Sequence, residues 1–371
     1  MNFDFLFKID KTLFIAAIAL ILVGLIIIFS TSYSSTGTDF FNFKKQLVFS
    51  GIGIALMLVA SFFDYRALKN YTGILYVFAC FILVAVLYSG SLIRGTSSWF
   101  SFGFFNFQPA EFVKIIAIII LAKYLSQPAN LSGDLKKIIV SGIYLSLPVL
   151  LIIFQPDFGS ALVIIFVWFA MLFITGINKK YLALILILGL LFSALSWSYF
   201  LKDYQKDRII TFVNPQSDPR GAGYNVIQSI IAVGSGEIWG KGLGRGSQSQ
   251  LNFLPEKHTD FIFAVVAEEM GFIGILLVLG FFGIIFYRFF YIIKESQDNF
   301  GKLLVLGTAF MLMFHIVVNA GMNMGIMPVT GIPLPFVSYG GSSLISMLIM
   351  LGLTQSVYIK GRSYKFKKEE E

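Results

Sequence analysis

Long apolar runs separated by short polar segments make up most of this chain, and the pattern predicts a membrane protein built from helices. A helix needs about 20 apolar residues to cross the hydrocarbon core of a bilayer. Runs of roughly that length occur at 12–32, 45–63, 70–89, 109–126, 137–154, 158–176, 181–200, 261–289, 302–324 and 340–359. We therefore expect an all-α integral membrane protein with about ten transmembrane helices, folded as one polytopic domain over residues 1–371.

The basic residues predict how these helices are oriented. An even number of spans places both termini on one side of the membrane. If that side is cytoplasmic, the short outside loops carry only Lys44, Lys45 and Arg94, and most other Lys and Arg residues lie inside. Short cytoplasmic loops are enriched in Lys and Arg. We therefore expect cytoplasmic termini and a large extracytoplasmic loop, residues 201–260, between the seventh and eighth helices.

Composition excludes several classes of site. The chain is 57% hydrophobic and 13% charged, whereas soluble domains carry about 25% charged residues. A single cysteine, Cys80, excludes an internal disulfide and a cysteine-built metal centre. Two histidines are too few for a histidine centre, although carboxylates could hold a divalent cation such as Mg²⁺ or Mn²⁺. We expect no organic cofactor. The net charge of +8 lies in short clusters between apolar runs, so we expect no nucleic-acid partner.

Polar residues on the predicted outer side indicate where a site could lie. Glu111 and Lys114 are three residues apart and share one face of the fourth helix. A charge in the bilayer costs about 2.5–3.5 kcal/mol on insertion scales, so each should face a cavity or a partner. The two side chains either only pair with each other or belong to a binding site. Trp99 is either an interfacial anchor or part of that site.

Two aspartates stand at the start of apolar runs, and a glutamate lies inside one of these runs. Short acidic side chains are common helix N-caps, and we favour that role for Asp157. Asp260 follows the segment Leu254–Thr259 at the head of the eighth helix, where a cap and a catalytic carboxylate are equally open. Glu268 lies eight residues further along, within a quarter turn of the same face. It either belongs to the site or forms hydrogen bonds between helices.

The outer loop contains two different segments. Apolar residues recur at helical spacing over Tyr224–Gly234, which predicts an amphipathic helix in the membrane interface. The following segment, Gly234–Gly246, is dense in glycine. Its backbone amides, with Lys241 and Arg245, could hold a pyrophosphate group, or the segment could be only a flexible connector.

A third unusual segment, Gly325–Ser343, is largely apolar but contains three prolines and four glycines that break any helix. Irregular backbone at membrane depth is tolerated where protein buries it or where it lines a wet cavity. The segment therefore predicts a non-helical stretch within the membrane part of the protein.

Five sequence blocks, in this order, resemble the SEDS family of polytopic cell-wall proteins from the first helix to the last. These are FQPAEFVK at 107–114, QPDFG at 155–159, GAGY at 221–224, LPEKHTDFIF at 254–263 and PLPFVSYGGSS at 333–343. The segment Gln248–Phe253 is similar to the RodA-like elongation branch more than to the FtsW-like division branch. Two residues depart from the pattern: Glu237 stands where glycine is usual, and Ser98 stands where a basic residue is common.

The resemblance implies a peptidoglycan glycosyltransferase that polymerises lipid II in the bacterial cytoplasmic membrane during cell elongation. It implies a class B penicillin-binding protein and the elongation machinery as partners. The family's essential loop carboxylate falls on Asp260, its basic residue of the fourth helix on Lys114, and its loop tryptophan on Trp99. The further substrate-binding candidates are Glu111, Asp157, Lys241, Arg245, Glu256, His258 and Ser338.

These residues support a mechanism beyond what the resemblance implies. The donor sugar of lipid II is attached by an α-phosphate bond and the product is β-1,4 linked, so one inverting displacement needs one base. We expect Asp260 to be that base, kept ionised by the opposite charge of Lys114. Lys241, Arg245 or a bound divalent cation would compensate the charge of the departing undecaprenyl pyrophosphate.

Two alternatives come from other functional classes. A lipid II flippase would need polar groups through the full depth of the membrane, whereas here they cluster on the outer side. A scaffold that only positions a synthase would not require Asp260. A role in division instead of elongation is an alternative within the family.

Cross-linking of the glycan would need a second protein, because nothing in the sequence resembles a transpeptidase motif. The resemblance points to the ninth helix, roughly Lys302–Met324, as the surface for a single-span partner. Its small residues could admit a partner helix, or they could pack inside the bundle. These residues are Gly307, Ala309, Ala320 and Gly321.

Overall fold

The structure is a computed structural model that describes residues 9–34, 37–93, 96–103, 105–127, 133–199, 203–218 and 221–369. Arg94, which entered the orientation argument, lies outside these ranges. So do Leu201 and Lys202, where the predicted outer loop begins.

Each of the ten apolar runs forms a helix, which confirms the helical membrane class. These helices are α1 (Lys11–Thr31), α2 (Phe41–Phe62), α3 (Leu68–Ser89), α4 (Pro109–Leu125), α5 (Asp134–Phe154), α6 (Phe158–Ile174), α7 (Lys179–Tyr199), α11 (Ile262–Glu295), α12 (Asn299–Asn323) and α13 (Gly341–Glu369). Within the described residues, seven helices are long and apolar enough to cross a membrane. Helices α4 and α6 have 17 residues each, or about 26 Å at 1.5 Å per residue. The total of ten spans stays a prediction.

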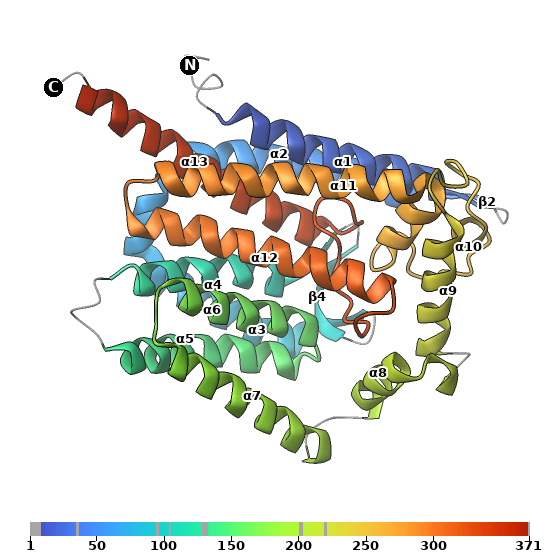
Figure 1. The fold of residues 1–371 in the computed structure, drawn as a ribbon, viewed down its shortest axis with the longest axis horizontal. Helices are drawn as coiled ribbons and strands as arrows, with labels where there is room; N and C mark the ends of the chain where they lie inside the picture. Colours follow the sequence, from blue (N-terminus) through green and yellow to red (C-terminus); the bar gives the residue numbers. More distant parts are fainter. Residues whose placement is uncertain are drawn as a thin grey trace.

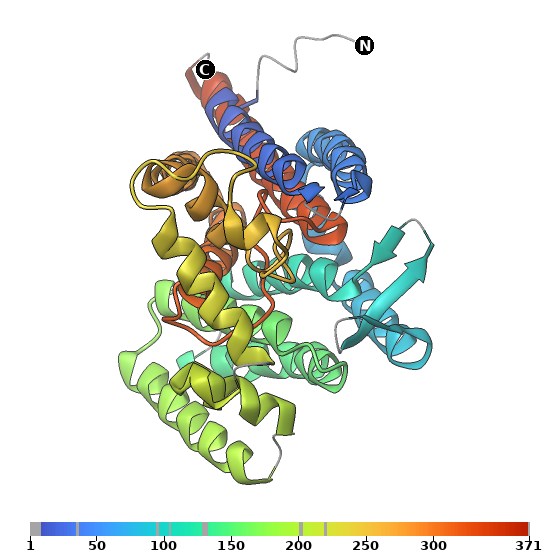
Figure 2. The same cartoon turned by 90° about the vertical axis from the view of Figure 1, so that its right-hand side faces the viewer.

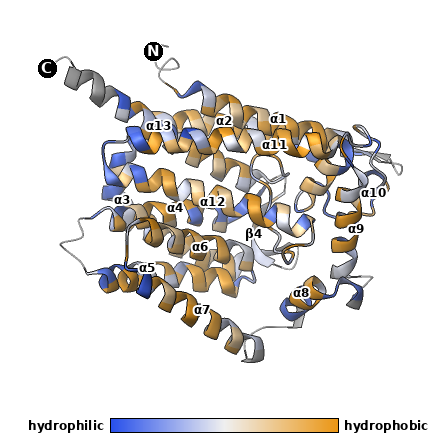
Figure 3. Cartoon of the chain, viewed as in Figure 1, coloured by the Kyte–Doolittle hydropathy of each residue, from blue (hydrophilic) through white to orange (hydrophobic). Residues whose placement is uncertain are grey.

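The helices lie side by side in one bundle, with shorter elements at one end (Figure 1). Helix α1 begins and α13 ends at the same end of the bundle (Figure 1). The elements between α7 and α11 lie at the other end: α8 (Asp203–Val213), a 3-10 turn (Pro215–Ser217), α9 (Ala222–Ser235) and α10 (Ser247–Gln250). Apolar residues run along the bundle helices and hydrophilic ones gather mainly at helix ends and connections (Figure 3).

The connections after α1 and α3 form small antiparallel sheets, which the all-α expectation did not include. Strands β1 (Tyr33–Ser34) and β2 (Gly37–Thr38) make one hairpin. Strands β3 (Ser91–Ile93), β4 (Thr96–Phe102) and β5 (Phe105–Phe107) make the other sheet, which projects beside the bundle (Figure 2). Backbone groups of these connections pair locally because each needs a hydrogen-bond partner.

Helix α11 is broken at Gly271, whose backbone angles are φ 67° and ψ −164°. The break frees backbone groups on both of its sides, and the glycine-dense segment of the outer loop pairs with them. The amides of Lys241 and Gly242 donate to the carbonyls of Glu268 and Glu269, at 2.9 and 3.0 Å. On the other side, the amide of Phe272 donates to the carbonyl of Glu237, also at 2.9 Å.

The glycine-dense segment is therefore docked on α11, and the flexible-connector interpretation is wrong. Gly236 lies so close to the helix that an added Cβ would stand 1.8 Å from the carbonyl oxygen of Ala267. Close backbone contact of this kind is possible only for a residue without a side chain. The glycines thus allow the loop backbone to form hydrogen bonds with the backbone groups that the break in α11 leaves free. Irregular backbone in a membrane protein requires such partners within the protein.

The amphipathic helix predicted over 224–234 is present as α9. It packs against α11 and α12. The Ser229 hydroxyl donates to the backbone carbonyl of Asn323 at 2.9 Å. Val226 and Ala232 are buried, whereas Ile230 and Ile231 are exposed. One face of α9 is therefore covered by protein, and its placement in the membrane interface stays a prediction.

Two of the small residues of the ninth predicted helix, now α12, pack inside the bundle. A Cβ on Gly307 would stand 2.6 Å from Ile118 of α4, and one on Gly321 would stand 2.9 Å from Met327. The expectation that these glycines admit a partner helix is therefore wrong. Their small size serves internal helix packing instead. Ala309 and Ala320 are partly buried against the core.

Replacing Glu237 with glycine should stabilise the protein. Glu237 has a φ of 47°, and this left-handed conformation costs a non-glycine residue roughly 1–2 kcal/mol. Part of that gain is lost again through the larger backbone entropy of glycine in the unfolded chain. We expect Glu237→Gly to raise the free energy of unfolding by up to about 1 kcal/mol, measured by thermal unfolding in detergent.

The matched control is Glu237→Gln, which removes the charge but keeps the Cβ atom. It should leave the unfolding midpoint near that of the wild type. If glutamine stabilised the protein as much as glycine, the charge of Glu237 and not its backbone conformation would be the cause.

Candidate functional site

A cavity of about 440 Å³ opens among the loops and helix ends on the side of α8 and α9. Its lining comes from α2, β4, α4, the turn before α6, α8, α9, the loop before α11, α12 and the irregular segment before α13. The acidic and basic residues that line it are Lys45, Glu111, Lys114, Asp157, Arg208, Glu256, Asp260 and His315. Six of the ten sequence-predicted site residues therefore meet here, including Trp99.

Asp260 lies at the cavity wall just before α11. The N-cap position of the helix is occupied by Phe261, and the first-turn amide of Ala264 donates to the Asn323 side chain at 3.2 Å. The backbone carbonyl of Asp260 accepts hydrogen bonds from the side-chain amides of Asn319 and Asn323, at 3.0 and 2.9 Å. Asp260 is thus held at its backbone carbonyl by α12, and the residue lines the cavity.

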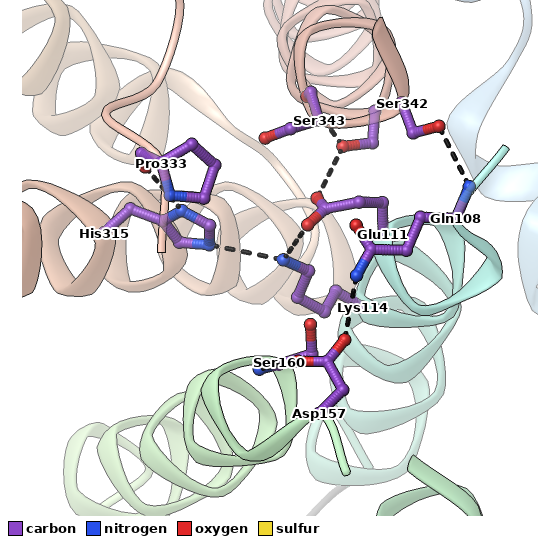
Figure 4. Close-up of polar contacts among 10 residues, drawn as sticks. Gln108, Glu111, Lys114, Asp157, Ser160, His315, Pro333, Ser342 and Ser343 are labelled. Atoms are coloured by element: carbon purple, nitrogen blue, oxygen red, sulfur yellow. Dashed lines mark hydrogen bonds and ion pairs between the residues drawn. The ribbon is translucent and has the colours of Figure 1, made fainter. Parts of the chain in front are cut away.

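Glu111 and Lys114 form a buried ion pair within the first turns of α4. The Lys114 Nζ lies 2.7 Å from Glu111 Oε1, and both side chains are almost completely buried. The Ser346 hydroxyl of α13 donates to the second oxygen of Glu111 at 3.2 Å. The predicted pairing is therefore confirmed. Because both residues also line the cavity, pairing and membership of the site are not exclusive (Figure 4).

Asp157 both caps a helix and faces the cavity. Its Oδ1 accepts from the amide of Ser160, which confirms the predicted N-cap of α6. Its Oδ2 accepts from the side-chain amide of Gln108 at 2.8 Å (Figure 4). Burial raises the pKa of Asp157, and the Ser160 hydrogen bond and the positive charge of Lys114 oppose that rise. Burial and these two partners thus act on the pKa of the Asp157 carboxyl group in opposite directions.

The loop that carries Asp260 is fastened by Lys257 and Glu256. The Lys257 ammonium donates to the carbonyl of Ser249 at 2.7 Å and to Asn252 Oδ1 at 2.8 Å. Burial lowers the pKa of Lys257, with the charge of Glu269 acting in the opposite direction. Glu256 lines the cavity and accepts from the Thr259 hydroxyl at 3.0 Å.

Four predicted substrate contacts do not line the cavity. Lys241 donates to Glu268 Oε1 at 3.1 Å, and Arg245 is exposed on the loop. His258 and Ser338 form part of the support behind Asp260. The Ser338 hydroxyl donates to the carbonyl of Thr259 at 2.7 Å, and the carbonyl of His258 accepts from the amide of Tyr339 at 2.8 Å.

Glu268 is a structural anchor of the outer loop. Its fully buried carboxylate accepts from Lys241 and from the backbone amides of Gln248 and Ser249, at 2.8 and 3.0 Å for the two amides. The sequence left two roles open for Glu268, membership of the site and hydrogen bonding between helices. The hydrogen-bonding role is confirmed, and the partners of Glu268 lie in the segment between α9 and α11.

Sequence reasoning missed several residues of this region. Lys45 entered only the orientation argument, and Arg208 lies on α8, which was not predicted. Asn319 and Asn323 stand four apart in an apolar run, so they share a helix face. Polar residues inside a span are costly, and that signal could have identified this pair.

The described residues hold no group of three or more His, Cys, Asp or Glu side chains placed to bind a metal. Three of the four cavity carboxylates bond to different partners: Glu111 to Lys114, Asp157 to Gln108 and Ser160, and Glu256 to Thr259. The expected divalent cation stays a prediction.

The buried pair makes a prediction about stability. Lys114→Met should lower stability by about 3–5 kcal/mol, because it leaves the Glu111 carboxylate buried without its cation. The double variant Glu111→Gln with Lys114→Met should recover most of this loss. Thermal unfolding of the purified proteins measures both effects.

Lys123→Met is the matched control, since Lys123 donates to the hydroxyl of Thr72 and lies at the other end of α4. It should cost much less than Lys114→Met. Equal stability of the Lys114 single variant and the double variant would contradict the pairing argument.

Comparison with known proteins agrees with this architecture. The family of cell cycle proteins that includes FtsW, RodA and SpoVE matches residues 10–362 of the chain. The peptidoglycan glycosyltransferase MrdB of Escherichia coli K12 is 35% identical over 349 residues, covering 94% of this chain and 93% of MrdB.

Two solved structures are similar over nearly the whole chain. One belongs to a peptidoglycan synthase complex that coordinates polymerization and crosslinking. It has a TM-score of 0.81 and 31% identity, and covers 95% of this chain and 98% of that one. The other is the rod shape determining protein RodA of Thermus thermophilus, with a TM-score of 0.70 and 30% identity, covering 94% and 96% of the two chains.

Proposed function

The chain belongs to the FtsW/RodA/SpoVE family of cell cycle proteins and is a peptidoglycan glycosyltransferase; we propose that it polymerises lipid II in the cavity described above. The observation that supports this proposal is the placement of Asp260 in the same cavity as three basic residues, Lys45, Lys114 and Arg208. A base and several cations are the groups that displacement of a pyrophosphate by a sugar hydroxyl requires.

In the proposed reaction, the acceptor hydroxyl attacks the anomeric carbon of the donor sugar while the bond to the phosphate oxygen breaks. The configuration inverts from α to β, so one displacement without a covalent intermediate is sufficient. The Asp260 carboxylate takes the hydroxyl proton, and undecaprenyl pyrophosphate leaves with the bonding electron pair. Pyrophosphate is a good leaving group and needs cations more than it needs a proton donor.

The cations that face this leaving group differ from those expected from the sequence. Lys241 and Arg245 do not line the cavity, whereas Lys45, Lys114 and Arg208 do. We assign the compensation of pyrophosphate charge to these three residues. Thr330 also supports ligand binding: it lines the cavity, and its buried hydroxyl has no hydrogen-bond partner among the described residues. Such a group is available to a substrate hydroxyl.

The cavity location favours an enzyme over a flippase. A headgroup carrier needs a polar path through the membrane, but the part of α4 beyond Lys114 is apolar and buried from Ile115 to Ala122. The charged residues of the cavity lie at one end of the bundle. If the purified protein made no polymer, a flippase would be the second candidate function.

We further propose that this end of the bundle faces the outside of the bacterial cytoplasmic membrane and that both termini are cytoplasmic. The basic residues of the short loops support this orientation. We assign the protein to cell elongation, acting with a class B penicillin-binding protein, because one structural relative is a rod shape determining protein and another belongs to a synthase complex. Tethering a cross-linking enzyme would raise its effective concentration at the growing glycan.

Asp260→Asn should abolish polymerisation of labelled lipid II by the purified protein in detergent. The substitution removes the base but keeps the backbone carbonyl that Asn319 and Asn323 hold, so the fold should survive. A loss of at least about 100-fold is expected for a general base. Gel analysis of the glycan products gives the rate, and thermal unfolding checks the fold.

Asp39→Asn is the matched control, since this aspartate is exposed and its side chain accepts a hydrogen bond from the amide of Phe41. It should retain wild-type turnover. Near-normal polymerisation by Asp260→Asn would show that Asp260 is not the base.

A further inference from the structure

His315 is a cavity residue that has no role in the reaction described above. It lies on α12, is fully buried, and lines the cavity. Its Nε2 atom is 3.4 Å from Lys114 Nζ, and its Nδ1 atom is 3.3 Å from the carbonyl oxygen of Pro333. Figure 4 shows the Lys114 ammonium group between Glu111 and His315.

The two partners of His315 determine its tautomer. A carbonyl oxygen only accepts hydrogen bonds and an ammonium group only donates them. Both contacts are therefore satisfied in one state alone: neutral imidazole with its hydrogen on Nδ1 and a lone pair on Nε2. In this state His315 donates to Pro333 and accepts from Lys114.

An ammonium group has three N–H donors and rotates freely about its last carbon–nitrogen bond. Glu111 takes one donor and His315 takes a second. Two acceptors in fixed positions stop the rotation, so the third N–H has a defined direction. Because Lys114 lines the cavity, that donor is available to a ligand.

We propose that His315 is a positioning residue that orients the Lys114 ammonium group toward the phosphate oxygens of the substrate. The inference rests on the proposed function, since it assigns Lys114 to the pyrophosphate. A preorganised donor stabilises developing charge without reorganisation during the reaction. His315 thus acts through Lys114 and takes no part in bond breaking.

The contact with Pro333 does not explain this histidine by itself. The irregular segment around Pro333 has other supports: Asn319 donates to the carbonyl of Ile332 at 2.8 Å, and the Ser338 hydroxyl accepts from the amide of Leu334 at 2.9 Å. The contribution specific to His315 is a second acceptor, its Nε2 atom, for the Lys114 ammonium group.

Two substitutions separate the two nitrogen atoms of His315. Glutamine places a polar atom near the position of Nε2 and can still accept from Lys114. Asparagine places one near the position of Nδ1, so it can donate to Pro333 but cannot reach Lys114. We expect His315→Gln to keep kcat/KM for lipid II within about threefold of the wild type, and His315→Asn to lower it by about tenfold or more, as for loss of a charged hydrogen bond.

A purely structural role through Pro333 predicts the reverse order, with asparagine active and glutamine impaired. That order, or equal activity of the two variants, would overturn the inference. Rates are normalised to folded protein from size-exclusion chromatography, so poor folding of one variant does not decide the result.

The experiment also separates this inference from the proposed function. If the wild type polymerises lipid II and Asp260→Asn does not, the proposed function holds whichever way the His315 variants behave. If the purified wild type makes no polymer, the proposed function fails and the assignment of His315 fails with it.

Discussion

The two hydrogen bonds from Asn319 and Asn323 to the backbone carbonyl of Asp260 are the interaction on which the site depends. Inside a membrane protein, each backbone group outside a regular helix must find a partner within the protein. The loop before α11 meets that constraint through side chains of α12. The carboxylate of Asp260 is therefore placed by rigid helices, although it belongs to a loop.

The same constraint shapes the rest of the end of the bundle that holds the cavity. The break in α11 at Gly271 is satisfied by the backbone of the glycine-dense loop. That loop is held in turn by the contact of Lys241 with the buried carboxylate of Glu268. The residues that follow it, Gln248 and Ser249, are held by Glu268 and Lys257. Ser338 joins the irregular segment before α13 to the loop of Asp260. Two of these irregular segments, the loop of Asp260 and the segment before α13, line the cavity, as is typical of irregular backbone at membrane depth.

Two charged side chains of the cavity, those of Lys114 and Asp157, are each held by two neighbouring polar groups. Lys114 is engaged by Glu111 and His315, and Asp157 by Gln108 and Ser160. A buried ion pair contributes little net stability because desolvation offsets its Coulomb energy. Its contribution is a defined geometry. An ammonium group held by two acceptors presents its remaining donor in one direction, which suits recognition of a phosphate.

The sequence by itself determined the helical membrane class and the family, since apolar runs of bilayer length and five ordered blocks are local features of the chain. It also identified Asp260, Glu111, Lys114 and Asp157, because charged residues beside apolar runs are costly and therefore informative. The tertiary structure decided which of the candidates meet in one cavity. Lys241 and Lys45 are both basic residues on the predicted outer side, and only packing places Lys241 on Glu268 and Lys45 on the cavity wall. Contacts such as that of His315 with Lys114 join residues about 200 positions apart, and no local pattern encodes a distance of that kind.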